Sequence, residues 1–131
     1  MAKKEINGLS QSIIDSYSSQ LLEVSKNIDQ DIQKAAELII NNSGKVVISG
    51  LGKSGLIGQK IVATLCSTGT RSVYMHAAEA IHGDLGIYNP GDPTILISKS
   101  GNTEELVRLI PVLKEFQSPL IAIVGLSLIH I

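Results

Sequence analysis

The sequence VVISGLGKSG, residues 46–55, joins an apolar run to a turn that is rich in glycine and serine. Successive β-branched residues of this kind are typical of a strand that is buried on both faces of a parallel sheet. After the turn, apolar residues recur at helical spacing from about Ser54 to Ser67. The stretch therefore predicts a strand that passes into a helix within a few residues. The residues predicted to face inward from this helix are Ile57, Ile61, Val62 and Leu65.

A second stretch, TILISKSGNTEE at residues 94–105, repeats this pattern. It predicts a strand over 94–98 and a helix over about 103–116, in which Pro111 should kink or loosen one turn. The apolar face of that helix comprises Leu106, Leu109, Ile110 and Leu113. Further strands are predicted at 71–75 and 120–124, a short helix within 77–84 and a turn at 89–92. Strands that alternate with helices indicate an α/β fold with three αβα layers, a parallel sheet and right-handed crossovers.

The first part of the chain has a different pattern. Apolar residues recur every three or four positions from about residue 5 to 42, which predicts one amphipathic helix or two helices joined at a bend. Ser43-Gly44 is the predicted C-cap. We expect the apolar stripe to pack on the edge of the domain and on another subunit. The predicted organisation is a helical segment at 1–44, an α/β domain at 45–125 that is incomplete because no helix follows Gly125, and a non-native tail at 126–131.

Composition limits the classes of partner. The 131 residues form at most one α/β domain, and a net charge of -1 creates no field that would attract nucleic acid or an anionic membrane. Aromatic residues make up 3% and tryptophan is absent, which argues against base stacking. No run approaches the roughly 20 apolar residues of a membrane span. The single cysteine, Cys66, lies on the apolar face of a predicted helix, so we expect it to be buried and inert in a cytoplasmic protein.

The two strand-to-helix turns are the candidate functional elements. The first N–H groups of a helix have no partner within the helix, and together with the helix dipole they favour an anion. Glycine allows close approach, and serine and threonine hydroxyls add donors. The two turns therefore predict one phosphate site to which both contribute. Lys53, His82 and Glu105 are candidates to act on the molecule that carries the phosphate, whereas Glu104 is an ordinary partner of the helix dipole.

Other interpretations of these motifs agree less well with the sequence. Residues 50–55 fit the pattern G-x-G-x-x-G, but no acidic residue ends the next predicted strand near Tyr74-Met75-His76, which argues against a dinucleotide. A P-loop would need glycine where Val47 stands, which argues against nucleotide hydrolysis. The first turn could also serve packing alone, with Lys53 solvated. In the second turn, ordinary N-capping would account for one of the three hydroxyls.

The segment HAAEAIHGDLG, residues 76–86, carries two histidines and two acidic residues. Their spacing matches no strong zinc motif, so we expect no metal, and the chain gives no indication of any other cofactor. His76 is interpreted as a structural residue. His82 is the candidate for chemistry because it adjoins the glycine at position 83.

Five segments in this order carry a resemblance to a known family: residues 50–55, 67–70, 82–86, 98–105 and 109–114. Over residues 5 to 125 the chain resembles the sugar isomerase (SIS) domain of bacterial arabinose-5-phosphate isomerases, which feed Kdo synthesis for lipopolysaccharide or capsule. The resemblance implies a flavodoxin-like sheet and a tetramer with sites at subunit interfaces. Family members usually continue to another glutamate and histidine, and many add paired CBS domains; these are not present here. Position 99 is often Asn in the family and position 102 often Glu, where this chain has Lys99 and Asn102.

The resemblance also implies site residues and a reaction. The implied phosphate-binding residues are the hydroxyl-bearing Ser54, Ser98, Ser100 and Thr103, and the implied catalytic residues are Lys53, His82 and Glu105. Gly52 and Asn102, which belong to the same two turns, are further candidates for phosphate binding. The implied reaction interconverts D-ribulose 5-phosphate and D-arabinose 5-phosphate through a cis-enediol. Two alternatives stay open. One is a regulatory SIS module that senses a phosphosugar without turning it over, and the other is an SIS isomerase for a hexulose or heptose phosphate.

Overall fold

The computed structural model describes residues 3–26 and 28–125, and the predicted tail at 126–131 lies outside them. The chain divides into two compact units, residues 1–37 and 38–131. No helix in these described stretches combines the length and apolar character that crossing a membrane requires.

Of the two arrangements predicted for the first part of the chain, the structure has two helices, α1 (Lys3–Ser25) and α2 (Asp29–Ile40). The predicted C-cap at Gly44 is wrong, because α2 already ends at Ile40. Gly44 has a steric role instead. A Cβ atom at this position would lie 2.0 Å from Oδ1 of Asp92, so a side chain would displace that carboxylate.

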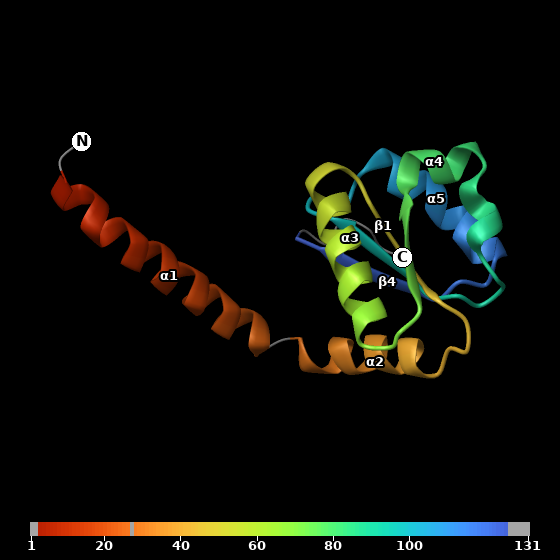
Figure 1. Ribbon diagram of the computed structural model, residues 1–131, viewed down its shortest axis with the longest axis horizontal. Helices are drawn as coiled ribbons and strands as arrows, with labels where there is room; N and C mark the ends of the chain where they lie inside the picture. The colour runs from red at the N-terminus through yellow and green to blue at the C-terminus, as the bar shows by residue number, and fades with distance from the viewer. Residues whose placement is uncertain (1–2, 27, 126–131) are drawn as a thin grey trace. The chain divides into compact units, whose positions relative to one another are not determined.

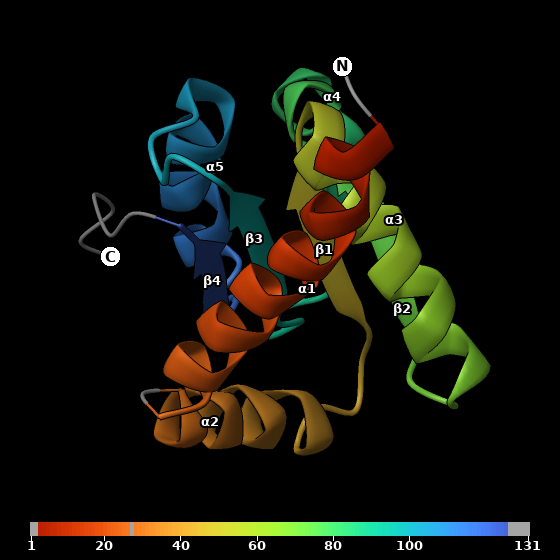
Figure 2. The same ribbon diagram turned by 90° about the vertical axis from the view of Figure 1, so that its left-hand side faces the viewer.

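The four strands form one parallel sheet in the order β2-β1-β3-β4, which Figure 2 shows across its width. In chain order they are β1 (Val46–Gly50), β2 (Ser72–His76), β3 (Thr94–Ser98) and β4 (Leu120–Val124). At the carboxyl edge, Gly50 of β1 is in register with His76 of β2 on one side and with Ile97 of β3 on the other. The predicted parallel α/β sheet is therefore confirmed. All residues of β1 and β3 are buried, as the continuous apolar runs indicated.

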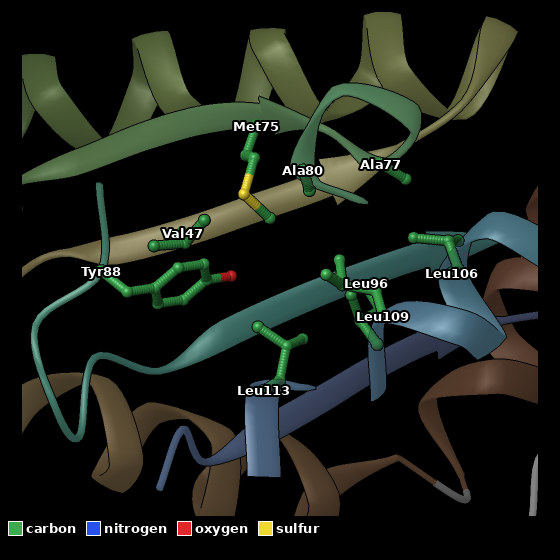
Figure 3. Close-up of a cluster of buried hydrophobic side chains, with 9 residues drawn as sticks. All are labelled: Val47, Met75, Ala77, Ala80, Tyr88, Leu96, Leu106, Leu109 and Leu113. Carbon is green, nitrogen blue, oxygen red and sulfur yellow. The ribbon is translucent and has the colours of Figure 1, made fainter. Parts of the chain in front are cut away.

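Helices cover both faces of the sheet, which confirms the three-layer architecture (Figure 1). On one face, α3 (Gly52–Ser67) and the end of α2 pack on Val46, Ile48, Ile95 and Ile97. On the other face lie α4 (Ala77–His82), a short 3₁₀ helix (Asp84–Ile87) and α5 (Glu104–Glu115). Figure 3 shows the cluster on this second face, in which Leu106, Leu109 and Leu113 of α5 are fully buried. Helix α5 continues through Pro111.

Two predictions about α3 are wrong, namely the burial of Ile57 and the burial of Cys66. The helix presents Gly55 and Gly58 to the sheet; a Cβ at Gly58 would lie 3.2 Å from both Ile48 and Tyr74. This glycine face turns Ile57 outward, where it is 56% exposed. Cys66, predicted to be buried, is exposed as well. Its sulfur lies 3.3 Å from the hydroxyl of Ser72.

A buried carboxylate fixes the amino edge of the sheet. Asp92 is 1% exposed, and its Oδ2 lies 2.5 Å from Nζ of Lys45. The same carboxylate accepts hydrogen bonds from the backbone N–H groups of Lys45, at 3.1 Å, and Asn89, at 2.8 Å. Asp92 thereby joins the residue before β1 to the loop before β3. Burial alone would raise the pKa of Asp92, but the hydrogen bonds from Lys45 and Asn89 outweigh it and hold the pKa below its usual 3.8.

We predict that Asp92→Asn lowers the free energy of unfolding by about 3 kcal/mol at neutral pH, because it leaves the Lys45 ammonium without its counter-charge. A group whose pKa is depressed by folding contributes stability above its unfolded pKa and loses it as the pH falls through the folded pKa. The difference in the free energy of unfolding between wild type and Asp92→Asn should therefore reach its full value above about pH 4 and shrink below it.

Urea unfolding at several pH values measures this difference in free energy. Glu104→Gln, which breaks an exposed ion pair with Arg108, is the control and should cost under about 1 kcal/mol. An equal cost for both variants would contradict the prediction.

Candidate functional site

The two predicted turns meet at the carboxyl edge of the sheet. They follow β1 and β3, which are adjacent strands, and a parallel pair ends at the same edge. A cavity of about 380 Å³ lies there, and its lining comes from both turns and from the residue after β4: Ser54, Lys99, Ser100, Thr103 and Gly125. Ser54 and Lys99, which are far apart in the sequence, thus share one small site at the start of two helices.

Neither of these helices receives a hydrogen bond from the side chain of its N-cap residue. The N-cap of α3 is the apolar Leu51, and the N–H of Gly55 is the first to bond within the helix, to the Leu51 carbonyl at 3.2 Å. The N-cap of α5 is Thr103, and the N–H of Val107 bonds to its carbonyl at 3.0 Å. The earlier N–H groups of both helices have no acceptor inside the helix, so they can bind an anion placed between them.

The second turn holds its shape with its own hydroxyls. Ser98 is 3% exposed, and its Oγ accepts from the N–H of Gly101 at 3.1 Å and shares a hydrogen bond of 2.8 Å with Oγ1 of Thr103. Oγ of Ser100 accepts from the N–H of Asn102 at 3.2 Å. Gly101 has φ +69°, a left-handed conformation that glycine adopts without strain. The hydroxyls of this turn therefore organise the loop rather than cap α5.

The predicted phosphate-binding residues fall into two groups in the structure. Three of them line the cavity: Ser54, Ser100 and Thr103. The other three lie in the turns but not in the lining: Gly52, Ser98 and Asn102. Sequence reasoning also missed one residue. Lys99 is exposed and lines the cavity, where its ammonium can neutralise an anion. The signal that could have identified it is a basic residue inside a hydroxyl-rich turn.

The three predicted catalytic residues begin or end helices near the same edge. Lys53 is exposed in the first turn of α3, His82 is the exposed last residue of α4, and Glu105 is partly buried in the first turn of α5. Helices α4 and α5 pack against each other, and Ala80 and Leu109 belong to the same buried cluster. Glu104 forms an ion pair with Arg108, whereas Glu105 has no cationic partner among the described residues. None of Lys53, His82 and Glu105 lines the 380 Å³ cavity.

A second cavity, of about 450 Å³, lies against β2, α4 and the 3₁₀ helix, and Tyr74, His76, Glu79 and Asp84 are part of its lining. Its two carboxylates would repel phosphate, so the smaller cavity beside Lys99 is the better phosphate site. His76, interpreted from the sequence as structural, has a buried Nδ1 with no hydrogen-bond partner. Among the residues that the structure describes, no three His, Cys, Asp or Glu side chains cluster closely enough to hold a metal ion.

We predict that Lys99→Gln weakens the binding of inorganic phosphate roughly 3- to 10-fold, because it removes a cation from the cavity lining. The effect should shrink at high salt, since exposed charges are screened. Isothermal titration calorimetry measures the affinity. Lys114→Gln removes an exposed lysine from the other end of α5 and is the control. Equal phosphate affinity of Lys99→Gln and Lys114→Gln would contradict this assignment.

Comparison with known proteins identifies the family. The model of the SIS domain matches residues 39–128. "Arabinose 5-phosphate isomerase KpsF" of Escherichia coli O6:H1 (strain CFT073) is 51% identical over 107 residues, which are 81% of this chain and 33% of that protein. "Arabinose 5-phosphate isomerase KdsD" of Salmonella typhi is 50% identical over 105 residues, 80% of this chain and 32% of that protein.

This chain thus spans about a third of the length of these curated relatives. Among solved structures, the c3406 protein of E. coli CFT073, in complex with arabinose 5-phosphate, superposes with a TM-score of 0.88 at 34% identity. The superposition covers 99% of this chain and 69% of that one. With its parallel αβα sheet, its paired turns and this match over most of its residues, the chain belongs to the SIS domain family.

Proposed function

We propose that this chain is the phosphosugar-binding part of an aldose–ketose isomerase that interconverts D-ribulose 5-phosphate and D-arabinose 5-phosphate. The observation that carries the proposal is the cavity to which both strand-to-helix turns contribute hydroxyls and a lysine. The names of the relatives, and the arabinose 5-phosphate complex of the similar structure, support this choice of sugar. The product would enter Kdo synthesis for lipopolysaccharide or capsule. A phosphorylated substrate and a single cysteine fit a cytoplasmic enzyme.

The phosphate would be the anchor of the substrate. The hydroxyls of Ser54, Ser100 and Thr103 and the ammonium of Lys99 line its cavity, and the free N–H groups of α3 and α5 complete the donor set. Ser98, Asn102 and Gly52 would act by holding the two turns in shape. Because the phosphate is at the far end of the sugar from the reacting carbons, its binding energy can orient C1 and C2 without taking part in the chemistry.

The reaction moves one proton between carbons. A base takes a proton from C1 of the ketose, the electron pair forms the C1=C2 bond, and the C2 oxygen becomes an enediolate. The base then returns the proton to C2, while a hydroxyl proton passes from the C1 oxygen to the C2 oxygen and C1 becomes an aldehyde. The two sugars have the same composition, so the step needs no external oxidant or reductant.

Each catalytic candidate fits one part of this step. Glu105 is proposed as the base, because the residue is partly buried beside the cavity-forming turn and has no ion-pair partner among the described residues. The ammonium of Lys53 would stabilise the enediolate. His82 would assist ring opening or orient a hydroxyl.

We also propose that the protein is a homo-oligomer, a tetramer as the family resemblance implies. In the first unit, α1 exposes a series of large apolar side chains, and Ile13, Tyr17 and Leu21 among them are 47%, 66% and 68% exposed. They recur every four residues, so they form one face of the helix. A second copy that covers this face would bury it.

For assembly we predict that Tyr17→Asp shifts the protein from oligomer to smaller species, because it places a charge in the proposed apolar interface. Light scattering coupled to size-exclusion chromatography measures the mass. Ser19→Asp is the matched control, since at 100° per residue it lies about 200° around the helix from Tyr17. A monomeric wild type, or equal masses for both variants, would overturn this proposal.

For activity we predict that Lys53→Ala and Glu105→Gln each reduce turnover of D-ribulose 5-phosphate roughly 100- to 10,000-fold. The assay should use this chain and a longer form that continues past Gly125. Lys60→Ala, an exposed lysine of α3 away from the turn, is the control. Near-normal turnover would remove the substituted residue from the mechanism. A longer form that binds the phosphosugar without turning it over would favour the regulatory alternative.

A further inference from the structure

A tyrosine that belongs to neither turn forms a hydrogen bond to the first turn, which joins β1 to α3. Tyr74 lies in the middle of β2, and its hydroxyl donates a hydrogen bond of 2.6 Å to the carbonyl oxygen of Gly50. Gly50 is the last residue of β1, and α3 begins two residues later. The bond therefore connects the neighbouring strand to the peptide group at which the chain leaves the sheet.

Two glycines make room for this contact. A Cβ on Gly55 would lie 2.5 Å from the Tyr74 hydroxyl oxygen, and a Cβ on Gly58 would lie 3.2 Å from the tyrosine ring. Real Cβ atoms do not approach other atoms as closely as the first of these distances, so the hydroxyl reaches Gly50 only because residue 55 has no side chain. The turn itself is equally tight, since a Cβ on Gly50 would lie 3.0 Å from the backbone of Ser54.

This contact determines how the start of α3 faces the phosphate cavity. The carbonyl that accepts the bond belongs to the peptide group between Gly50 and Leu51, and Leu51 is the uncapped N-cap of α3. The bond fixes the plane of that peptide group, and with it the N–H of Leu51, at the point from which the turn runs to Ser54 in the cavity lining. Tyr74 itself lies outside that lining and cannot reach the anion directly.

We propose that Tyr74 is a positioning residue for the phosphate site, which acts by holding the β1–α3 turn in the conformation that presents its N–H groups and Ser54 to the anion. The inference rests on the proposed function in that it assigns the cavity beside Ser54 to the sugar phosphate. Substitution of a residue with this role changes substrate affinity because it weakens the binding of the phosphate, and it leaves the contacts of the reacting carbons unchanged.

The test compares two tyrosines that each lose only a hydroxyl. Tyr74→Phe removes the bond to Gly50, and it should weaken the binding of inorganic phosphate and of D-arabinose 5-phosphate roughly 2- to 10-fold. Tyr88→Phe is the matched control, because the Tyr88 hydroxyl is also hydrogen-bonded, to Thr94 at 2.9 Å near the amino edge of the sheet. It should lower the melting temperature and leave both affinities unchanged. Calorimetry on the full chain gives the affinities.

A second readout separates positioning from general loss of stability. In ¹⁵N–¹H spectra of the free protein, Tyr74→Phe should shift the amide signals of Leu51, Gly52 and Lys53, whereas Tyr88→Phe should leave them in place. Where turnover is measurable, Tyr74→Phe should raise KM for D-ribulose 5-phosphate and change kcat little, because the lost contact concerns the anchor.

A double-mutant cycle tests the geometry even where one variant is poorly stable. Gly55→Ala places its methyl group against the Tyr74 hydroxyl, so it should weaken phosphate binding more in wild type than in the Tyr74→Phe background, where that oxygen is absent. Additive effects would show that residues 55 and 74 do not meet in this way and would overturn the proposal.

The outcomes distinguish this inference from the proposed function. If wild type binds D-arabinose 5-phosphate and Tyr74→Phe binds it equally well with unshifted amide signals, Tyr74 has no positioning role and the proposed function stands. If wild type binds neither phosphate nor the phosphosugar, the phosphate site is wrong and both fall. Weaker binding by Tyr74→Phe alone, with shifted signals in the first turn, supports both.

Discussion

Neither of the two helices that begin at the carboxyl edge of the sheet is capped by the side chain of its N-cap residue, and this absence shapes the functional edge of the molecule. Helix α3 follows the buried strand β1 and α5 follows the buried strand β3. The N–H groups that remain free lie at the ends of two adjacent parallel strands, so their dipoles converge on one volume. An anion satisfies donors that the fold itself leaves without acceptors, which is why this edge suits a phosphate ester.

A turn that contains glycine has a flexible backbone, so hydrogen bonds from other groups must hold each of the two turns in shape. In the second turn the constraint is local, because Ser98 bonds to the N–H of Gly101 and to the hydroxyl of Thr103 a few residues away. In the first turn it comes from another strand, through the Tyr74 hydroxyl. The difference follows from composition, since Leu51 and Gly52 have no polar side chain with which to stabilise their own loop.

Most of the fold could be predicted from the sequence, because strands and buried helix faces leave a pattern in neighbouring residues. Continuous apolar runs marked β1 and β3, and the spacing of Leu106, Leu109 and Leu113 marked the buried face of α5. The spacing of apolar residues did not, however, predict which face of α3 packs against the sheet. Apolar spacing placed Ile57 inside, but Gly55 and Gly58 face the sheet, and a glycine carries no hydropathy signal for close packing. For the site, the hydroxyl-rich turns were visible in the sequence, whereas the contact of Tyr74 with Gly50 spans 24 residues and has no local pattern.

The polar anchor of the sheet lies at the edge opposite the turns. There the Asp92 carboxylate, Lys45 and the hydroxyls of Thr94 and Ser118 bond to one another or to the adjoining backbone. The bonds that hold the strands together at the amino edge are thus separate from the side chains of Ser54, Lys99, Ser100 and Thr103 that line the cavity. A substitution at one of these four positions can therefore alter which sugar is bound while the sheet keeps its polar anchor.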